Sequence, residues 1–151
     1  MNTRLKYIAF ICLIVIAQHS FSQERNTDNV NYIEKARNAV KLSLNELAIQ
    51  YYLSAIDADS SSAQAYYELG CLYTDMELYT LAIPNFMSAL SLNANDANSH
   101  ERLAYIYTEN EDYERAYTHA QKAIELDPML PSPYATMGVY YCIKKEDVHE
   151  S

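Results

Sequence analysis

Small and apolar residues recur along the chain at a fixed spacing of 34 positions. The small positions are Ala36, Gly70, Ala104 and Gly138 in one series, Ala48, Ala82 and Ala116 in a second, and Ala55, Ala89 and Ala123 in a third. Both glycines of the chain belong to the first series. Since a small side chain marks the place where a neighbouring helix comes close, the spacing predicts an array of repeated helix pairs.

Aromatic residues occupy fixed positions between the small ones. They are Tyr32, Tyr66 and Tyr134 in one series, with His100 in the place of an aromatic, and Tyr73, Tyr107 and Tyr141 in another. Large residues set against small ones at a constant spacing form a packing pattern. Its extension in both directions along the chain separates a repeat array from a chance match between two amphipathic helices.

This pattern resembles that of the tetratricopeptide repeat family, whose unit of about 34 residues consists of two antiparallel helices, A and B. The residues that carry the resemblance are Tyr66, Leu69, Gly70, Tyr73, Ala82, Phe86 and Ala89 in one unit, and Leu103, Ala104, Tyr107, Ala116, Ala123 and Pro128 in the next. The departures are Ala94 in place of the closing proline, His100, and Ala120 where an aromatic is usual. The resemblance covers about residues 29 to 143.

The resemblance implies an all-α fold, a right-handed α-solenoid of antiparallel helix pairs with about seven helices. Three repeat units are expected over residues 29–62, 63–96 and 97–130, and a partial unit over 131–144 supplies only helix A. A charged tail is expected over residues 145–151. The expected helices cover about Val30–Leu42, Glu46–Ala58, Ala63–Asp75, Leu78–Leu92 and Pro133–Lys144, with the third pair between Ala97 and Asp127 and Asp112 as an N-cap within it.

The first 22 residues have the pattern of a signal peptide. Arg4 and Lys6 precede an uncharged apolar run, and Ser20-Phe21-Ser22 offers small residues at the positions that a signal peptidase reads. The alternatives are a buried helix or a membrane anchor, but the run is shorter than the roughly 20 residues that span a bilayer. We therefore expect cleavage before Gln23, a mobile polar lead over residues 23–28, and an exported protein of the bacterial envelope, periplasmic or secreted.

The chain is acidic, with 11 Lys and Arg against 20 Asp and Glu and a net charge of −9. The expected signal peptide holds two of the basic residues and none of the acidic ones, so the mature chain has 9 minus 20, a net charge of −11. Nucleic acids and anionic lipids are bound through cationic groups, so this balance disfavours both as partners. Neutral or basic partners are favoured instead.

In tetratricopeptide repeats the A helices line a concave groove, and the resemblance implies which residues face or border it here. They are Arg37, Gln64, Tyr67, Glu68, Cys71, Asn98, Glu101, Arg102 and Tyr105. The set is aromatic in the middle and polar around it, which suits an extended peptide or a partner's helix. Tyr67 and Tyr105 are the candidate anchors for a ligand. Family members that capture an acidic chain end use two Lys, two Asn and one Arg; only Arg102 matches in this chain, so that activity is not expected.

No motif of the chain predicts catalysis or a cofactor. His100, His119 and His149 have no metal-ligand spacing with one another or with a cysteine, so no metal site is predicted. Cys71 and Cys142 would lie on A helices of different units, about 16 to 20 Å apart, so we expect two free and largely buried thiols. The sequence therefore predicts a protein that is not an enzyme.

Two functions remain open at this point. The first is a non-catalytic scaffold or adaptor that binds a peptide segment or a partner subunit in the groove of A helices. The alternative is a binding protein for a non-protein envelope ligand such as a glycan, which would stack on Tyr67 and Tyr105.

The last expected helix carries an unusual amount of apolar surface for the end of an array. Its apolar residues are Met137, Val139, Tyr140, Tyr141, Cys142 and Ile143. Either the tyrosine hydroxyls make this exposure tolerable, or the surface is a contact face for a second copy of the chain, as in a homodimer, or for another partner.

Overall fold

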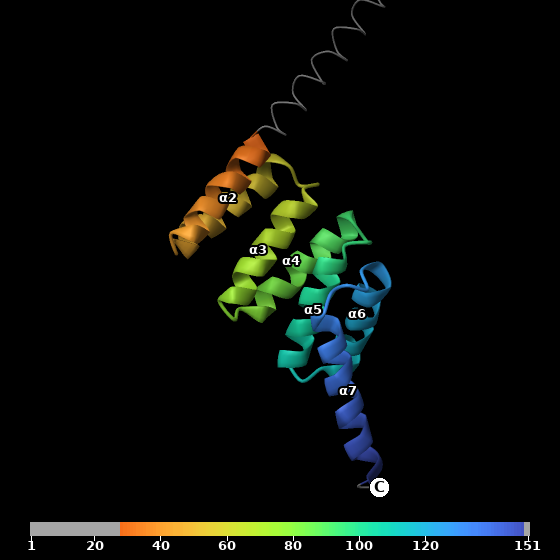
Figure 1. Cartoon of the computed structure of the whole chain (residues 1–151). Coiled ribbons are helices and arrows are strands. Elements are labelled where there is room, and N and C mark those ends of the chain that lie inside the picture. The colour runs from red at the N-terminus through yellow and green to blue at the C-terminus, as the bar shows by residue number, and fades with distance from the viewer. Residues whose placement is uncertain (1–27, 150–151) are drawn as a thin grey trace, which may run out of the picture. The chain divides into compact units, whose positions relative to one another are not determined.

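The computed structural model describes residues 28–149, and every regular element within that range is a helix (Figure 1). The expected signal peptide and residues 23–27 of the expected polar lead lie outside the described residues. The helices are residues 28–41, α2 (Asn45–Ala58), α3 (Ala63–Asp75), α4 (Tyr79–Leu92), α5 (Ala97–Glu109), α6 (Tyr113–Leu126) and α7 (Ser132–His149). The predicted all-α fold is confirmed.

The chain divides into two compact units, Met1–Ser61 and Ser62–Ser151. Within the described part of the first unit, the helix over residues 28–41 pairs with α2. The side-chain amide of Asn29, which is buried, donates a hydrogen bond of 2.7 Å to the carbonyl of Ala55. Lys35 stands where the repeat pattern usually has leucine. Its Nζ lies 5.2 Å from the ring centre of Tyr32 and 6.0 Å from that of Tyr51. A cation–π contact thus replaces an apolar one.

The second unit consists of α3 to α7. α3 packs on α4 and α5 on α6, α4 and α5 join these pairs, and α7 packs on both α5 and α6. Phe86, Leu103 and Ile106 are fully buried at the centre of the core. At Gly70 an added Cβ would lie 2.9 Å from Cε1 of Phe86, so α3 and α4 can approach this closely only because the residue is glycine.

The turns between the helices of each pair share one conformation without using glycine. Ser43, Glu77 and Glu111 have φ of 58°, 59° and 59°, in the left-handed region, and they follow one another at the repeat spacing. Each lies at the end of a helix; after Glu77, for example, the N–H of Leu78 donates to the carbonyl of Tyr73 at 2.8 Å. This is the hydrogen bond of a Schellman motif, in which glycine is the usual left-handed residue.

The helix ends agree with the sequence in most places. α3 has the predicted bounds, and Asp112 is the N-cap of α6, where its side chain accepts a hydrogen bond of 3.2 Å from the N–H of Arg115. The last helix differs: it continues to His149, five residues beyond the predicted end at Lys144, so residues 145–149 belong to a helix and not to a tail. Within residues 28–149, none of the helices combines the length and the apolar character that crossing a membrane requires.

Candidate functional site

α3 and α5 lie against each other, and three of the predicted groove residues meet where they do. The hydroxyl of Tyr67 is within hydrogen-bonding reach of both the Cys71 thiol and the Arg102 guanidinium. All three side chains are half-buried. We call the surface formed by Tyr67, Cys71, Arg102 and Tyr105 the α3–α5 face.

Burial fixes the protonation of this cluster. It raises the pKa of Tyr67 to about 12 and also raises the pKa of the Cys71 thiol, so both groups are neutral at neutral pH. Burial works against the charged form of Arg102, but its neighbours Cys71 and Tyr67 outweigh that effect, and the pKa of the guanidinium is raised. The cluster therefore carries one positive charge. The Nε of Arg102 is buried without a hydrogen-bond partner, which is an unfavourable state for a donor.

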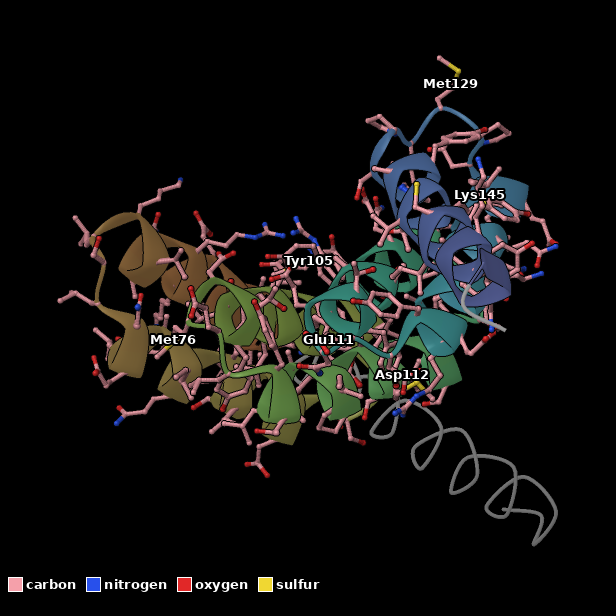
Figure 2. The ribbon with its side chains drawn as sticks, turned by 90° about the horizontal axis from the view of Figure 1, so that it is seen from below. Met76, Tyr105, Glu111, Asp112, Met129 and Lys145 are labelled. Carbon is pink, nitrogen blue, oxygen red and sulfur yellow. The ribbon has the colours of Figure 1, made fainter. Side chains whose placement is uncertain are left out.

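The two tyrosines of the face differ in what their rings can do. The Tyr67 ring packs edge-on against buried Phe86, with ring centres 5.8 Å apart, so it is part of the core. The Tyr105 side chain, which is labelled in Figure 2, is 40% exposed and packs at nearly a right angle to the Tyr79 ring, with ring centres 6.5 Å apart. The hydrogen bond with Tyr105 is the main reason that the pKa of Tyr79 is raised to about 12. Tyr105 is thus the open ring of this face.

The other predicted groove residues lie around the cluster or apart from it. On α3 the Gln64 amide donates to the Glu68 carboxylate at 3.1 Å. On α5 Asn98 is exposed and Glu101 is half-buried. Arg37 belongs to the first unit, in which it is exposed.

Neither Cys71 nor Cys142 forms a disulfide, as predicted. The prediction that both are largely buried is wrong. Cys71 is half-buried and Cys142 is exposed, because the described residues place no helix over the outer side of α7.

His100 and His119, whose contact the sequence did not predict, form a pair between α5 and α6. Their Nδ1 atoms lie 2.9 Å apart, so one of them donates to the other. The His119 ring also stacks on Tyr107, with ring centres 5.5 Å apart. Burial, and after it the charges of His100 and Arg115, lower the pKa of His119 to about 4. The two residues are 19 positions apart, a spacing that only the packing of two helices makes meaningful. Among residues 28–149 no group of three or more potential ligands could hold a metal ion.

A pocket of about 390 Å³ was also not predicted; it lies between the α5–α6 loop, which includes Glu111 and Asp112, and α7. It is lined by residues 110–114 and by Tyr140, Ile143 and Lys144. Glu114 accepts a hydrogen bond of 3.1 Å from the Tyr140 hydroxyl and forms an ion pair of 2.6 Å with Lys144. Lys144 was predicted to be the last residue of its helix, but its ion pair with Glu114 of α6 depends on how the two helices pack.

Stacked helix pairs of this kind define an all-α helical-repeat protein. Family models described as tetratricopeptide repeat match residues 63–96 and 97–129. Residues 63–129 thus belong to the tetratricopeptide repeat family, whose domains generally mediate protein–protein interactions and are typically non-catalytic scaffolds.

Solved structures support the same fold. The first tetratricopeptide repeat domain of Spaghetti (RPAP3), bound to the HSP90 peptide SRMEEVD, is 17% identical with a TM-score of 0.74, over 79% of this chain and 94% of that chain. The second such domain of human RPAP3, in complex with the HSP70 peptide SGPTIEEVD, is 16% identical with a TM-score of 0.72, over 78% and 98%. MamA is 22% identical with a TM-score of 0.73, over 84% and 76%. No curated protein matches the chain.

Proposed function

We propose that the chain is a non-catalytic adaptor that binds an extended segment of a partner protein on the α3–α5 face. The observation that carries this proposal is the environment of Arg102. Its charge is half-buried, its Nε has no acceptor, and the exposed ring of Tyr105 lies one helical turn further along the same helix.

An extended peptide can use the exposed part of the half-buried Arg102 side chain, while the Nε itself stays buried. The main-chain carbonyls of the peptide are acceptors for the guanidinium of Arg102, and a side chain of the peptide packs on the open ring of Tyr105. Two of the similar solved structures hold peptides, which supports a peptide as the ligand. The Tyr67 ring is already packed against Phe86, so the face offers one free aromatic platform and not the two that the glycan hypothesis uses.

The negative net charge of the chain determines which peptides it attracts. The net charge of −9 repels acidic segments at long range, and Glu68 and Glu101 flank the cluster. A neutral or basic segment is therefore the expected ligand, and its association should slow as salt is added.

We also infer that the chain is exported and acts in the bacterial envelope or outside the cell. The basic start, the short apolar run and the small residues before Gln23 support this. Sequencing the N-terminus of the protein recovered from producing cells tests the inference. We expect Gln23 as the first residue, and a retained Met1 would contradict cleavage.

The binding proposal is tested by selecting displayed random peptides on the full chain and titrating the selected peptides against variants. Arg102→Ala and Tyr105→Ala should each weaken binding at least tenfold, since such anchors each contribute about 1.4 kcal/mol or more. Tyr134→Ala is the matched control, because it removes a comparably exposed tyrosine from α7. Failure to select any peptide, or loss of binding only in the Tyr134 variant, would contradict the proposed face.

A further inference from the structure

The histidine pair between α5 and α6 has no part in the proposed peptide site, and its two rings meet through atoms that bind metal ions. Nδ1 of His100 lies 2.9 Å from Nδ1 of His119. A ring nitrogen that carries no proton has a free lone pair, which makes histidine the commonest metal ligand in proteins. The two residues come from different helices, so the packing of α5 on α6 sets the separation of the two nitrogens.

The repeat packing does not require histidine at these two positions. The pair α3 and α4 has Tyr66 and Asn85 at the equivalent positions. The pair formed by residues 28–41 and α2 has Tyr32 and Tyr51 there. Both pairs form without an imidazole at either position, so the two facing imidazoles are a feature of the α5–α6 pair alone.

The separation of the two nitrogens indicates which coordination geometry they fit. A histidine nitrogen lies about 2.0–2.1 Å from a bound divalent metal ion, so two such ligands at a right angle are about 2.8–3.0 Å apart. The same two ligands on a tetrahedral ion such as Zn²⁺ are about 3.3–3.4 Å apart. The observed 2.9 Å agrees with the right angle, which is the arrangement that Cu²⁺ and Ni²⁺ adopt with nitrogen and oxygen ligands.

Both rings are uncharged at neutral pH, which is the form that binds a metal ion. Burial is the main cause that lowers the pKa of both histidines, and that of His119 falls to about 4. One proton lies between the two Nδ1 atoms. It can move to the Nε2 atom of the ring that carries it, which frees both Nδ1 lone pairs without a change in charge.

Neighbouring groups orient both rings. The His119 ring stacks on Tyr107, with ring centres 5.5 Å apart. The His100 ring forms a hydrogen bond with the backbone of Ala94. Contacts of this kind fix the orientation of metal-binding histidines and are usual around them.

The charges near the pair largely offset one another. Lys122 and Arg115 oppose a cation, and Asp96 attracts one. The charge of Arg115 is offset by its ion pair with Asp112. The net charge of −9 attracts metal ions to the chain as a whole.

We propose that His100 and His119 form a binding site for a divalent transition metal ion with right-angled coordination, Cu²⁺ or Ni²⁺, which links α5 to α6. In the described part of the chain no third histidine, cysteine or carboxylate joins the pair, so water completes the coordination. The expectation of no metal site relied on spacing along the sequence, which does not reveal a pair formed between two helices. The site is separate from the α3–α5 face and does not depend on the peptide proposal.

The test is a calorimetric titration of the full chain, produced without a histidine tag, with Ni²⁺ at neutral pH. Ni²⁺ is the probe because Cu²⁺ would also oxidise the exposed thiol of Cys142. The variants His100→Tyr and His119→Asn introduce the residues that the α3–α4 pair has at these positions, so they are compatible with the repeat packing. We expect saturable binding of one ion, and at least tenfold weaker binding by each variant.

His149→Gln is the matched control, because it removes a histidine from the end of α7 and should bind Ni²⁺ as the natural chain does. Thermal melting by circular dichroism gives a second readout. An ion that binds only the folded chain raises the melting temperature, so saturating Ni²⁺ should stabilise the natural chain and the control. It should not stabilise His100→Tyr or His119→Asn, and the melting curves without Ni²⁺ check that both variants fold.

Three results would overturn the proposal. In the first, the natural chain does not bind Ni²⁺ even at millimolar concentration. In the second, folded His100→Tyr or folded His119→Asn binds Ni²⁺ as tightly as the natural chain, which would place the ion elsewhere. In the third, binding is lost in His149→Gln, which would place the ion at the end of α7.

Discussion

The helices α3 and α7 present the same arrangement of glycine between tyrosines to opposite surroundings. Around Gly70 the ring of Phe86 fills the space completely, and around Gly138 there is no atom to contact. The tyrosines that flank each glycine differ in the same way: they are half-buried on α3 and largely exposed on α7. The difference teaches that a repeat in the sequence reproduces a surface, while the partner of that surface is determined by which element comes next in space.

The largest expected loss of stability comes from removing the Phe86 ring that covers Gly70. Phe86→Ala removes a fully buried ring from the core of the second unit and should lower the free energy of unfolding by about 3–5 kcal/mol. Urea denaturation followed by circular dichroism measures the loss. A matched change on the open side, Tyr141→Ala, should cost much less, since more than half of that side chain is exposed. Equal losses would mean that the two faces are not different in packing.

Adding a methyl group at Gly70 should be the next largest effect, and its sign should depend on Phe86. In the natural chain the new Cβ of Gly70→Ala meets Cε1 of Phe86 at 2.9 Å, and overpacking of this kind costs about 1–3 kcal/mol. In the Phe86→Ala background the space is free, so the same change should stabilise the helix by about 0.5–1 kcal/mol. The double-mutant cycle in urea measures this coupling. Additive effects would show that the ring does not rest on Gly70.

The pair α5 and α6 should differ from α3 and α4 in its response to pH, because a histidine pair lies in it. The pKa of His119 is about 4 in the folded chain, against 6.5 for an ordinary histidine, so the unfolded chain binds the extra proton between these values. The contribution to stability is complete above pH 6.5 and is lost as the pH falls toward 4. Asp96, Lys122 and Arg115 are the charged neighbours of the pair.

The expected loss is on the order of 1 kcal/mol, because His119 is partly exposed and water screens its charge. Urea midpoints are measured for the natural chain and for His119→Gln, above pH 6.5 and near pH 4.5. The difference between the two proteins gives the contribution of His119, because the carboxylates titrate in both. The variant should lose less stability on acidification. An identical pH dependence would show that the pair does not titrate as described.

Most of the fold could be predicted from the sequence because the repeat packing is encoded locally. The small and large series place each helix, and the register brings Tyr67, Cys71 and Arg102 of the predicted groove together on one face. In contrast, the left-handed turns at Glu77 and Glu111 escaped prediction because the usual glycine signal is absent.

Contacts between helices that the repeat pattern does not specify were also missed. The pairing of His100 with His119 and the ion pair of Lys144 with Glu114 depend on which side chains two packed helices bring together. The repeat pattern also does not determine how deeply a single residue is buried. Cys142 follows the repeat pattern and was expected to be buried, yet it is exposed because burial also requires a covering element.

The smallest expected effect is at Gly138 of α7, and it is a gain in stability and not a loss. Gly138→Ala adds a methyl group to a position where it meets nothing, so only the gain in helix propensity remains, about 0.5–1 kcal/mol of added stability. A small rise of the urea midpoint with an unchanged slope would show it. The gain should equal that of Gly70→Ala in the Phe86→Ala background, since both glycines then face open space. A loss of stability at Gly138 would mean that in solution this face is already covered within the chain, and that α3 and α7 do not differ as the structure shows.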